Sequence, residues 1–317
     1  MRPFSKFPHS TSVIHPEFLT LCSYLPEGHI ETRESFLRLL TGCSGQLLKK
    51  HYSASSRREQ ILSKSVLSIP LDILNHREIS PVYIGKDTTE PIVIAVNSQW
   101  IVFHKPPHVH SHPLNYSDSL NCLSYLRAQG FGKDLQINQN QHERGLLYRL
   151  DYETSGVMVY CRNESLLIQC RDHFNQWAKT KTYLAIVHGR VEKEKELIHS
   201  LVPSQSKGSK MKAIAGTGAN LHVSPLAYSN EGMTLLKVNL HQGLRHQIRA
   251  QLSAIGHPIV GDPLYSLPGL EKKSYSRLYL HALTYAFTPF EGSGQLFTSP
   301  YWQDFAELMG QEISVLL

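Results

Sequence analysis

The sequence predicts a mixed α+β domain over about residues 85 to 317, preceded by a smaller N-terminal segment. From about residue 146 onward, short segments with strand character alternate with amphipathic segments of helical spacing. Before about residue 80, the apolar residues recur at helical spacing. The length of 317 residues, with 41% apolar and 18% charged residues, is typical of a globular protein that buries a substantial core.

Two helices are expected in the N-terminal segment. The apolar residues of 34–52 recur at helical spacing, and residues 55–67 run from polar to apolar. Ser55 and Ser56 precede Glu59, a pattern typical of a helix start. We therefore expect an accessory segment over residues 1–85 and the main domain over 86–317.

The main domain is expected to begin with strands, because β-branched runs bounded by proline occupy residues 91–107. Three further segments have strand character: residues 156–162, 182–191 and 234–243. Amphipathic spacing predicts helices over 164–178 and 245–256, the second ended by a glycine. Residues 204–220 are rich in Gly, Ser and Lys and predict an exposed basic loop.

Charge and cysteine usage narrow the class of protein. The formal net charge of +6 hints at a polyanionic partner, of which nucleic acid is the commonest. The five cysteines include no C-x-x-C pair, which favours reduced thiols over a disulfide framework or a zinc site. No apolar run approaches the ~18 residues of a membrane span, and the N-terminus lacks the apolar core of a secretory signal. We expect a cytoplasmic protein without membrane association.

One turn between two apolar runs holds an arginine and a carboxylate, in "GLLYRLDYETSGVMVY" (145–160). Asp151 is open to three interpretations. It could be a turn residue that accepts backbone N–H groups, an ion-pair partner of Arg149, or a nucleophilic or proton-transferring carboxylate. The third requires an oriented cation that keeps the carboxylate ionised when it is shielded from water. The chain must then supply a second cation elsewhere.

A source of that cation is "GLRHQIRAQLSAIGHPIVGDPLYS" (243–266). If residues 245–254 are helical, Arg245 and Arg249 lie four positions apart on one face. Two arginines at that spacing suit the recognition of phosphate or carboxylate, or they form a solvated basic face. The following "GHPIVGDPLY" is expected to be a rigid connector.

A histidine cluster raises the question of a metal site. His104, His108, His110 and His112 fall within nine residues, and the last three have the period of one strand face. No acid or cysteine accompanies them, and the Pro106–Pro107 pair favours a loop. We expect no metal site here.

Five blocks of the sequence resemble, in order, those of the RluA-type pseudouridine synthases. They are "HKPPHVHSHP" (104–113), "YRLDYETSG" (148–156), "KTYLAIVHG" (181–189), "GLRHQIRAQLSAIGHPIVGDPLY" (243–265) and "LYLHALTYAF" (278–287). The likeness covers roughly residues 91 to 310. It implies a central, mainly antiparallel sheet with flanking helices. It also implies the isomerisation of uridine to pseudouridine in structured RNA, ribosomal or transfer, without metal or organic cofactor.

The resemblance implies roles residue by residue. Asp151 would be the nucleophilic carboxylate, attacking C1′ of the ribose or taking a proton from C2′, and Arg249 would keep it ionised and aimed. Tyr183 would stack on the target base and could remove its C5 proton. Arg149 would help extrude the uridine or hold the backbone, and Arg245 would contact phosphate. One carboxylate, one cation and one ring fit the recognition of a flipped base.

Some positions depart from the family pattern and indicate a divergent member. Tyr148 stands where the family has His before "RLD", and Gln251 replaces the usual His after "HQIRx". Members often carry an N-terminal S4 RNA-binding domain, and residues 34–90, which are basic and helical, could be a degenerate version. Family resemblance favours a monomer.

Two other classes of protein compete with this interpretation. The first is a non-catalytic RNA-binding protein that retains the fold. The second is a carboxylate-based hydrolase, which needs a second carboxylate roughly 5–10 Å from the first. Glu153, two residues from Asp151 on the same turn, is expected to be poorly placed for that role.

Overall fold

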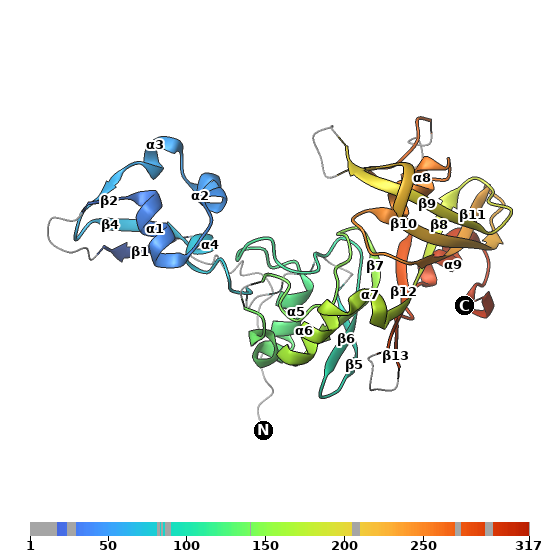
Figure 1. Cartoon of the computed structure of the whole chain (residues 1–317), viewed down its shortest axis with the longest axis horizontal. Helices are drawn as coiled ribbons and strands as arrows, with labels where there is room; N and C mark the ends of the chain where they lie inside the picture. The colour runs from blue at the N-terminus through green and yellow to red at the C-terminus, as the bar shows by residue number, and fades with distance from the viewer. Residues whose placement is uncertain are drawn as a thin grey trace, which may run out of the picture. The chain divides into compact units, whose positions relative to one another are not determined.

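The computed structural model describes residues 18–23, 30–80, 83, 85, 90–139, 141–204, 210–269, 274–288 and 294–316 (Figure 1). The chain divides into two compact units. One comprises residues 1–80 with 114–118, and the other comprises residues 81–113 with 119–317. Among the helices of the described ranges, none is long and apolar enough to cross a bilayer.

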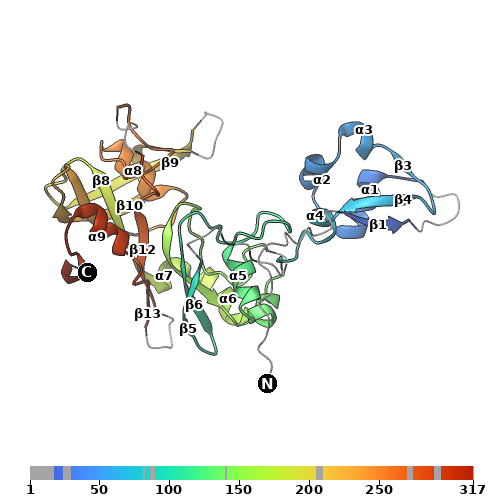
Figure 2. The ribbon, with the colours of Figure 1, turned by 180° about the vertical axis from the view of Figure 1, so that it is seen from behind.

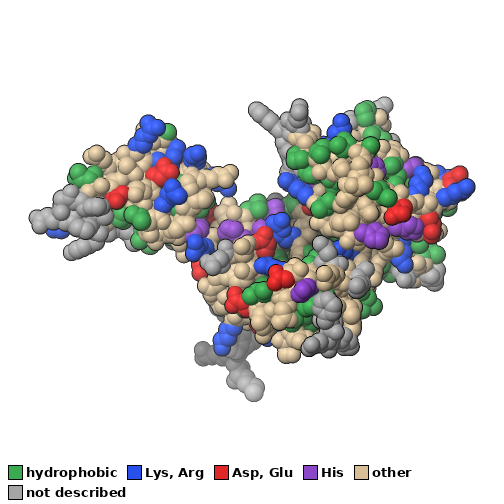
Figure 3. All heavy atoms as spheres, viewed as in Figure 1, with side chains coloured by type: hydrophobic (Ala, Val, Ile, Leu, Met, Phe, Trp, Pro, Cys, Tyr) green, Lys and Arg blue, Asp and Glu red, His purple; other side chains and the backbone are tan. Residues whose placement is uncertain are grey.

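The N-terminal unit combines short helices with two small antiparallel strand pairs. Its strands are β1 (Phe18–Cys22) with β4 (Val66–Pro70), and β2 (Glu31–Thr32) with β3 (Gln60–Ile61). Its helices are α1 (Arg33–Thr41), α2 (Gly45–His51), α3 (Ala54–Arg57) and α4 (Leu71–Leu74). A small apolar core, with Leu37, Leu48 and Ile69 at its centre, joins them. On its surface, basic side chains over α3 have acidic neighbours (Figure 3), because Arg57 pairs with Glu34 at 2.8 Å.

The two helices predicted here are corrected by the structure. The segment 34–52 is two helices, because Gly42 takes the left-handed conformation that ends α1 and Ser44 caps the start of α2. The helix predicted over 55–67 is wrong. Ser53 caps the short α3, and the chain then enters β3 and β4, where burial alternates as in a half-covered strand.

The main unit is built on a nine-stranded sheet with the order β5-β6-β7-β12-β8-β11-β10-β9, and β13 pairs with β12. Its strands are β5 (Ile92–Val96), β6 (Trp100–Lys105), β7 (Ser155–Cys161), β8 (Ala178–His188), β9 (Lys195–Pro203), β10 (Met211–Tyr228), β11 (Met233–Leu240), β12 (Leu280–Phe287) and β13 (Gln295–Thr298). Among these strands β7 and β12 pair in parallel, and the other pairs are antiparallel. The predicted mixed α+β fold with a mainly antiparallel sheet is confirmed.

Helices flank this sheet, as Figure 2 shows from behind. They are α5 (Cys122–Ala128), α6 (Glu164–Asp172), α7 (Phe174–Trp177), α8 (Gln247–Ala254) and α9 (Gln303–Met309), with short 3-10 helices over Phe131–Gln136 and Ser314–Leu316. Phe305 and Met309 of α9 pack into an apolar cluster with Leu184 of β8 and Leu235 of β11. Helix α8 lies against β10 and β9, which fixes the position of the side chains that it presents to the site.

The predicted strands of the main unit are confirmed at residues 91–107, 156–162, 182–191 and 234–243. The helix over 164–178 is interrupted at His173. The basic loop predicted over 204–220 is wrong for residues 211–220, which belong to β10, and 205–209 lie outside the described residues. The register of β10 against β9 shifts between Ile214 and Ala219, so glycine-rich residues that resemble a loop in sequence form a bulged strand.

Candidate active site

Asp151 lies on the turn directly before β7, in the main unit. The backbone carbonyl of Asp151 accepts the N–H of Thr154 at 3.1 Å, which closes the turn. The preceding residue is fixed by the buried Ser111, whose hydroxyl donates to the carbonyl of Leu150 at 2.8 Å and accepts its N–H at 3.1 Å. The carboxylate is therefore carried on a pinned backbone, and its side chain keeps 30% of its surface exposed.

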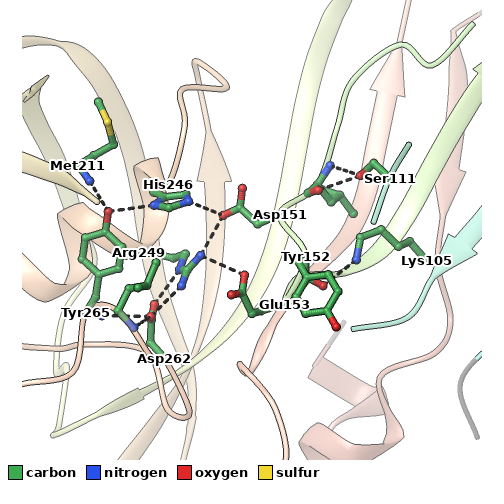
Figure 4. Close-up of polar contacts among 12 residues, drawn as sticks. Lys105, Ser111, Asp151, Tyr152, Glu153, Met211, His246, Arg249, Asp262 and Tyr265 are labelled. Atoms are coloured by element: carbon green, nitrogen blue, oxygen red, sulfur yellow. Dashed lines mark hydrogen bonds and ion pairs between the residues drawn. The ribbon is translucent and has the colours of Figure 1, made fainter. Parts of the chain in front are cut away.

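Arg249 of α8 contacts this carboxylate from the buried side (Figure 4). Its Nη1 lies 3.1 Å from Oδ2 of Asp151 and 3.5 Å from Oε2 of Glu153. Its Nε and Nη2 donate to the two oxygens of Asp262, each at 2.8 Å. Burial lowers the pKa of Arg249, whose side chain is 1% exposed, but the hydrogen bonds and charge of Asp262, aided by Asp151 and Glu153, leave the pKa above its ordinary value. The guanidinium is a permanent, oriented cation.

His246 lies on the other side of Asp151, directly before α8. Its backbone is left-handed, with φ 54° and ψ 20°. Its Nε2 is 3.7 Å from Oδ2 of Asp151, and its Nδ1 is 3.1 Å from the hydroxyl of Tyr265. That hydroxyl also accepts the backbone N–H of Met211 at 2.7 Å. Burial lowers the pKa of the His246 imidazole, and the nearby Asp151 carboxylate opposes this effect.

A buried lysine contacts the backbone of the turn that carries Asp151. Nζ of Lys105, at the end of β6, donates to the carbonyls of Pro106 at 2.9 Å and Tyr152 at 3.1 Å. Burial lowers the pKa of Lys105 to about 8, although Asp151 favours its charged form. The turn that carries Asp151 thus has a cation on each side, Lys105 and Arg249.

Tyr183 of β8 lies near this carboxylate, and its side chain is almost buried, with 6% of its surface exposed. Its hydroxyl is 2.9 Å from that of Tyr285, whose ring stacks on Tyr148 at a centroid distance of 3.9 Å. Burial raises the pKa of Tyr183 to about 12; the hydrogen bond from Tyr285 opposes this rise, and the charge of Asp151 adds to it. The three tyrosines are therefore connected, and Tyr183 is the member that lies near Asp151.

The two remaining predicted residues lie outside this cluster of contacts. Arg149 is 58% exposed and pairs with Glu143 at 3.1 Å, so the Arg149–Asp151 ion pair left open by the sequence does not form. Arg245 is exposed and lies in the turn before α8. The prediction that Arg245 and Arg249 share one helical face is wrong, because the left-handed His246 separates Arg245 from the helix.

The structure adds residues that the sequence reasoning missed. Asp262 sits in the segment expected to be only a rigid connector, and Glu153, considered in the sequence only as the second carboxylate of a hydrolase, shares Nη1 of Arg249 with Asp151. A single, partly exposed carboxylate is not enough to compensate a fully buried arginine. This need for a second carboxylate is the feature that could have indicated Asp262. His246 and Tyr265 carried no comparable signal, since their contacts depend on local backbone conformation.

The histidines of the 104–112 cluster do not share one set of partners, although the rings of His108 and His110 both contact Tyr152. His104 is buried and its Nδ1 is 2.8 Å from the hydroxyl of Ser299, whereas Nε2 of His112 is 3.4 Å from Nη1 of Arg149. Within the described ranges, no group of three His, Cys, Asp or Glu residues could hold a metal ion.

Comparisons with known proteins agree on one family. A family model described as RNA pseudouridylate synthase matches residues 99–254, a range that contains Asp151, Tyr183 and Arg249. Two Helicobacter pylori proteins, each named an uncharacterized RNA pseudouridine synthase, are similar to this chain. One is 32% identical over 204 residues and the other 38% over 205, each match covering 64% of this chain and 73% of the relative. The solved structure of human RNA pseudouridylate synthase domain containing 1 shares the fold, with a TM-score of 0.56 at 20% identity over 68% of this chain and 86% of that one.

Proposed function

We propose that this chain, which belongs to the RNA pseudouridylate synthase family, is an RluA-type enzyme that isomerises specific uridines in structured RNA, ribosomal or transfer. The observation that carries the proposal is the Arg249–Asp151 contact of 3.1 Å. A fully buried cation holds one oxygen of a carboxylate that remains partly exposed to solvent. Such a carboxylate is held by a fixed charge while it is still reachable by a substrate.

In the proposed reaction the target uridine leaves the RNA stack and enters the site. Asp151 attacks C1′ of the ribose, or takes a proton from C2′, and the C1′–N1 bond breaks. The base then turns and C5 bonds to C1′. In the first route this displaces the Asp151 ester, and in the second Asp151 returns the proton to C2′. C5 then loses its proton, and N1 gains one. Every atom of the nucleotide is retained, so the reaction is an isomerisation. In this scheme Asp151 supplies the reacting carboxylate, Arg249 its cation and Tyr183 an aromatic ring, without a metal or organic cofactor.

Tyr183 is proposed to act mainly through its ring. Its pKa of about 12 disfavours the phenolate that would remove a proton from C5, and its hydroxyl is already bonded to Tyr285. That bond holds the ring near Asp151, and we propose that the flipped base stacks on it. Stacking is therefore the better supported of the two roles considered for this residue.

The exposed cations are proposed to position RNA. Arg149 and Arg245 flank the turn and the start of α8, where they can contact phosphates on either side of the target nucleotide. Affinity would then come largely from counterion release and fall with salt. We assign residues 86–317 to catalysis and 1–85 to an accessory, degenerate S4-like segment. The enzyme would act as a monomer in the cytoplasm, where its RNA substrates are found.

The test is pseudouridine mapping in total RNA from cells with and without the gene. We expect one or more sites to disappear without the gene, to return with the wild-type chain, and to stay absent with Asp151→Asn. This substitution removes the carboxylate charge but keeps the shape of the side chain. The alternative, a non-catalytic RNA-binding protein that retains the fold, predicts no change at any site. If purified protein also converts no uridine in bulk ribosomal or transfer RNA, the enzyme assignment fails.

A further inference from the structure

We propose that His246 is a positioning residue that holds Oδ2 of Asp151 through Nε2–H and so leaves Oδ1 for the ribose. The proposal rests on the function proposed above and concerns the orientation of its nucleophile. Figure 4 shows the arrangement: the His246 ring lies between the Tyr265 hydroxyl and the Asp151 carboxylate, and Arg249 approaches the same carboxylate from α8.

The hydrogen bonds at Tyr265 favour one position for the ring hydrogen of His246. The backbone N–H of Met211 can only donate, so the Tyr265 oxygen accepts it at 2.7 Å. The hydroxyl hydrogen of Tyr265 is then available to donate to Nδ1 of His246, 3.1 Å away. In a neutral imidazole, an accepting Nδ1 requires that Nε2 bears the hydrogen. That hydrogen faces Asp151.

Burial is the main reason for a neutral His246 ring, because burial lowers its pKa, and the charged groups around the ring act in both directions. Asp151 and Asp262 come from the loops before β7 and after α8, Arg249 comes from α8, and Arg245 comes from the turn before it. The His246 side chain is only 8% exposed, so burial disfavours a charged ring; Arg249 and Arg245 add to this effect, whereas Asp151 and Asp262 oppose it. The left-handed backbone of His246 turns its side chain back toward the carboxylate, a conformation that non-glycine residues rarely adopt.

As a consequence, the two carboxylate oxygens of Asp151 have different surroundings. Oδ2 receives Nη1 of Arg249 at 3.1 Å and faces Nε2 of His246 at 3.7 Å. Within the described residues, Oδ1 has no hydrogen-bond or ion-pair partner. The 3.7 Å separation is longer than a hydrogen bond, and catalytic contacts of this kind shorten when substrate is bound. We expect the His246 contact to close as RNA covers the site, which fixes the carboxylate plane.

A double-mutant cycle tests the relay with RNA under single-turnover conditions. His246→Ala should slow conversion roughly 10- to 100-fold, as expected for a misaligned reacting group. The concentration of enzyme that gives the half-maximal single-turnover rate should change little. Tyr265→Phe keeps the ring under Arg249 but removes the hydroxyl, and it should slow conversion less. In the His246→Ala background, Tyr265→Phe should have no further effect. Independent, multiplying losses would overturn the relay.

His246→Gln supplies a conservative rescue, because its amide N–H can replace Nε2–H as a donor to Asp151. It should recover at least several-fold over His246→Ala. Tyr228→Phe is the matched control. Tyr228 also has an arginine over its ring, Arg190, and its hydroxyl bonds a backbone carbonyl, but it contacts no residue of the site. It should turn over RNA at the wild-type rate.

A measurement that does not depend on enzyme activity tests the role of His246 separately from the proposed function. Long-range ¹H–¹⁵N spectra distinguish the two neutral histidine tautomers, and the signal of His246 among 18 histidines is the one lost in His246→Ala. We expect the Nε2–H tautomer in the wild type, a shifted equilibrium in Tyr265→Phe, and no change in Tyr228→Phe. A charged or Nδ1–H ring in the wild type would overturn the proposal even if the enzyme is active. An inactive wild type with the expected tautomer would overturn only the function.

Discussion

Nη1 of Arg249 lies 3.1 Å from Oδ2 of Asp151, although the two residues are 98 positions apart in the chain. The other guanidinium nitrogens that make contacts, Nε and Nη2, are committed to Asp262. The bidentate contact fixes the plane of the guanidinium, and the remaining nitrogen is thereby aimed at the turn that carries Asp151 and Glu153. Arg249 thus works from inside the protein, and RNA cannot reach most of it.

This geometry predicts different effects on rate and on affinity when Arg249 is removed. Arg249→Ala leaves Asp151 without its buried cation, so we expect turnover to collapse by roughly 10³-fold or more, a loss of the size seen when one electrostatic group of an active site is removed. RNA affinity, measured by filter binding, should change little because the side chain is 1% exposed. Equal losses of both would identify Arg249 as a phosphate contact.

The bidentate anchor gives a separate prediction for Asp262. Asp262→Asn keeps the shape of the side chain but removes the charge opposite a buried guanidinium, at a cost of roughly 3–5 kcal/mol of unfolding free energy. Urea denaturation should show this loss. Glu153→Gln is the matched control, since Glu153 touches the same guanidinium at 3.5 Å from a partly exposed position and should cost well under half as much. Equal costs would mean that Asp262 is not the anchor.

The sheet was predictable where a strand's own residues carry the pattern. The β-branched runs of β6 and β7 are fully buried and appear in the sequence as apolar segments. In β10, by contrast, residues from Met211 to Gly218 are mostly exposed, and Gly216 and Gly218 have positive φ. This strand is held by pairing with β9, and a single sequence does not reveal which distant segment will supply the pairing.

The candidate site likewise has a part that the sequence predicted and a part that it did not. A shielded carboxylate needs a cation, and this requirement together with the family resemblance pointed to Asp151 and Arg249. The positions of His246 and Tyr265 depend instead on one left-handed residue and on the backbone N–H of Met211. Such features follow from the closure of loops in three dimensions, and no residue type or spacing in the sequence specifies them.

Tyr148, where the family has His, has a testable role in holding Tyr183. Its ring stacks on Tyr285 with an interplanar angle of 8°, and its hydroxyl donates to the carbonyl of Val157 at 3.0 Å. Tyr148→Phe keeps the stack and should cost about 1 kcal/mol of unfolding free energy. Tyr148→His loses the stack, so Tyr183 should shift and single-turnover conversion should fall by roughly tenfold. The same rate in both variants would argue against a positioning role.

Gly156 should be intolerant of any side chain, because β7 and β12 approach closely there. A Cβ on Gly156, where φ is 133°, would fall inside contact distance of the backbone O and N of Ala282, which cannot move without breaking the parallel pairing. Gly156→Ala should cost roughly 3 kcal/mol or more. Gly232 is the control: φ is 75° and nothing lies within 4 Å, so Gly232→Ala should cost about 1–2 kcal/mol from backbone strain alone. Thermal melts of both variants measure these two losses of stability.

Lys105 should give the rate an alkaline limit near pH 8. Burial lowers its pKa to about 8, so the ammonium that holds the Tyr152 carbonyl beside Asp151 is present below that pH and is lost above it. We expect single-turnover conversion to fall as the pH rises through about 8. In Lys105→Met the rate should be lower throughout, and this limb should be absent. A limb that stays at the same pH in the variant would belong to another group.

Stability should move in the opposite direction over the same pH range, which separates lost catalysis from unfolding. The unfolded chain keeps the proton of Lys105 up to its ordinary pKa of 10.5, whereas the folded chain releases it at about 8. The unfolded state therefore binds more protons between these values, and the contribution of Lys105 to the free energy of unfolding rises with pH across that window. Urea denaturation of wild type and Lys105→Met above and below pH 8 should show this rise in the wild type only. If the wild type instead loses stability from Lys105 as its activity falls, the alkaline limb reports unfolding and the assignment of Lys105 to the turn fails.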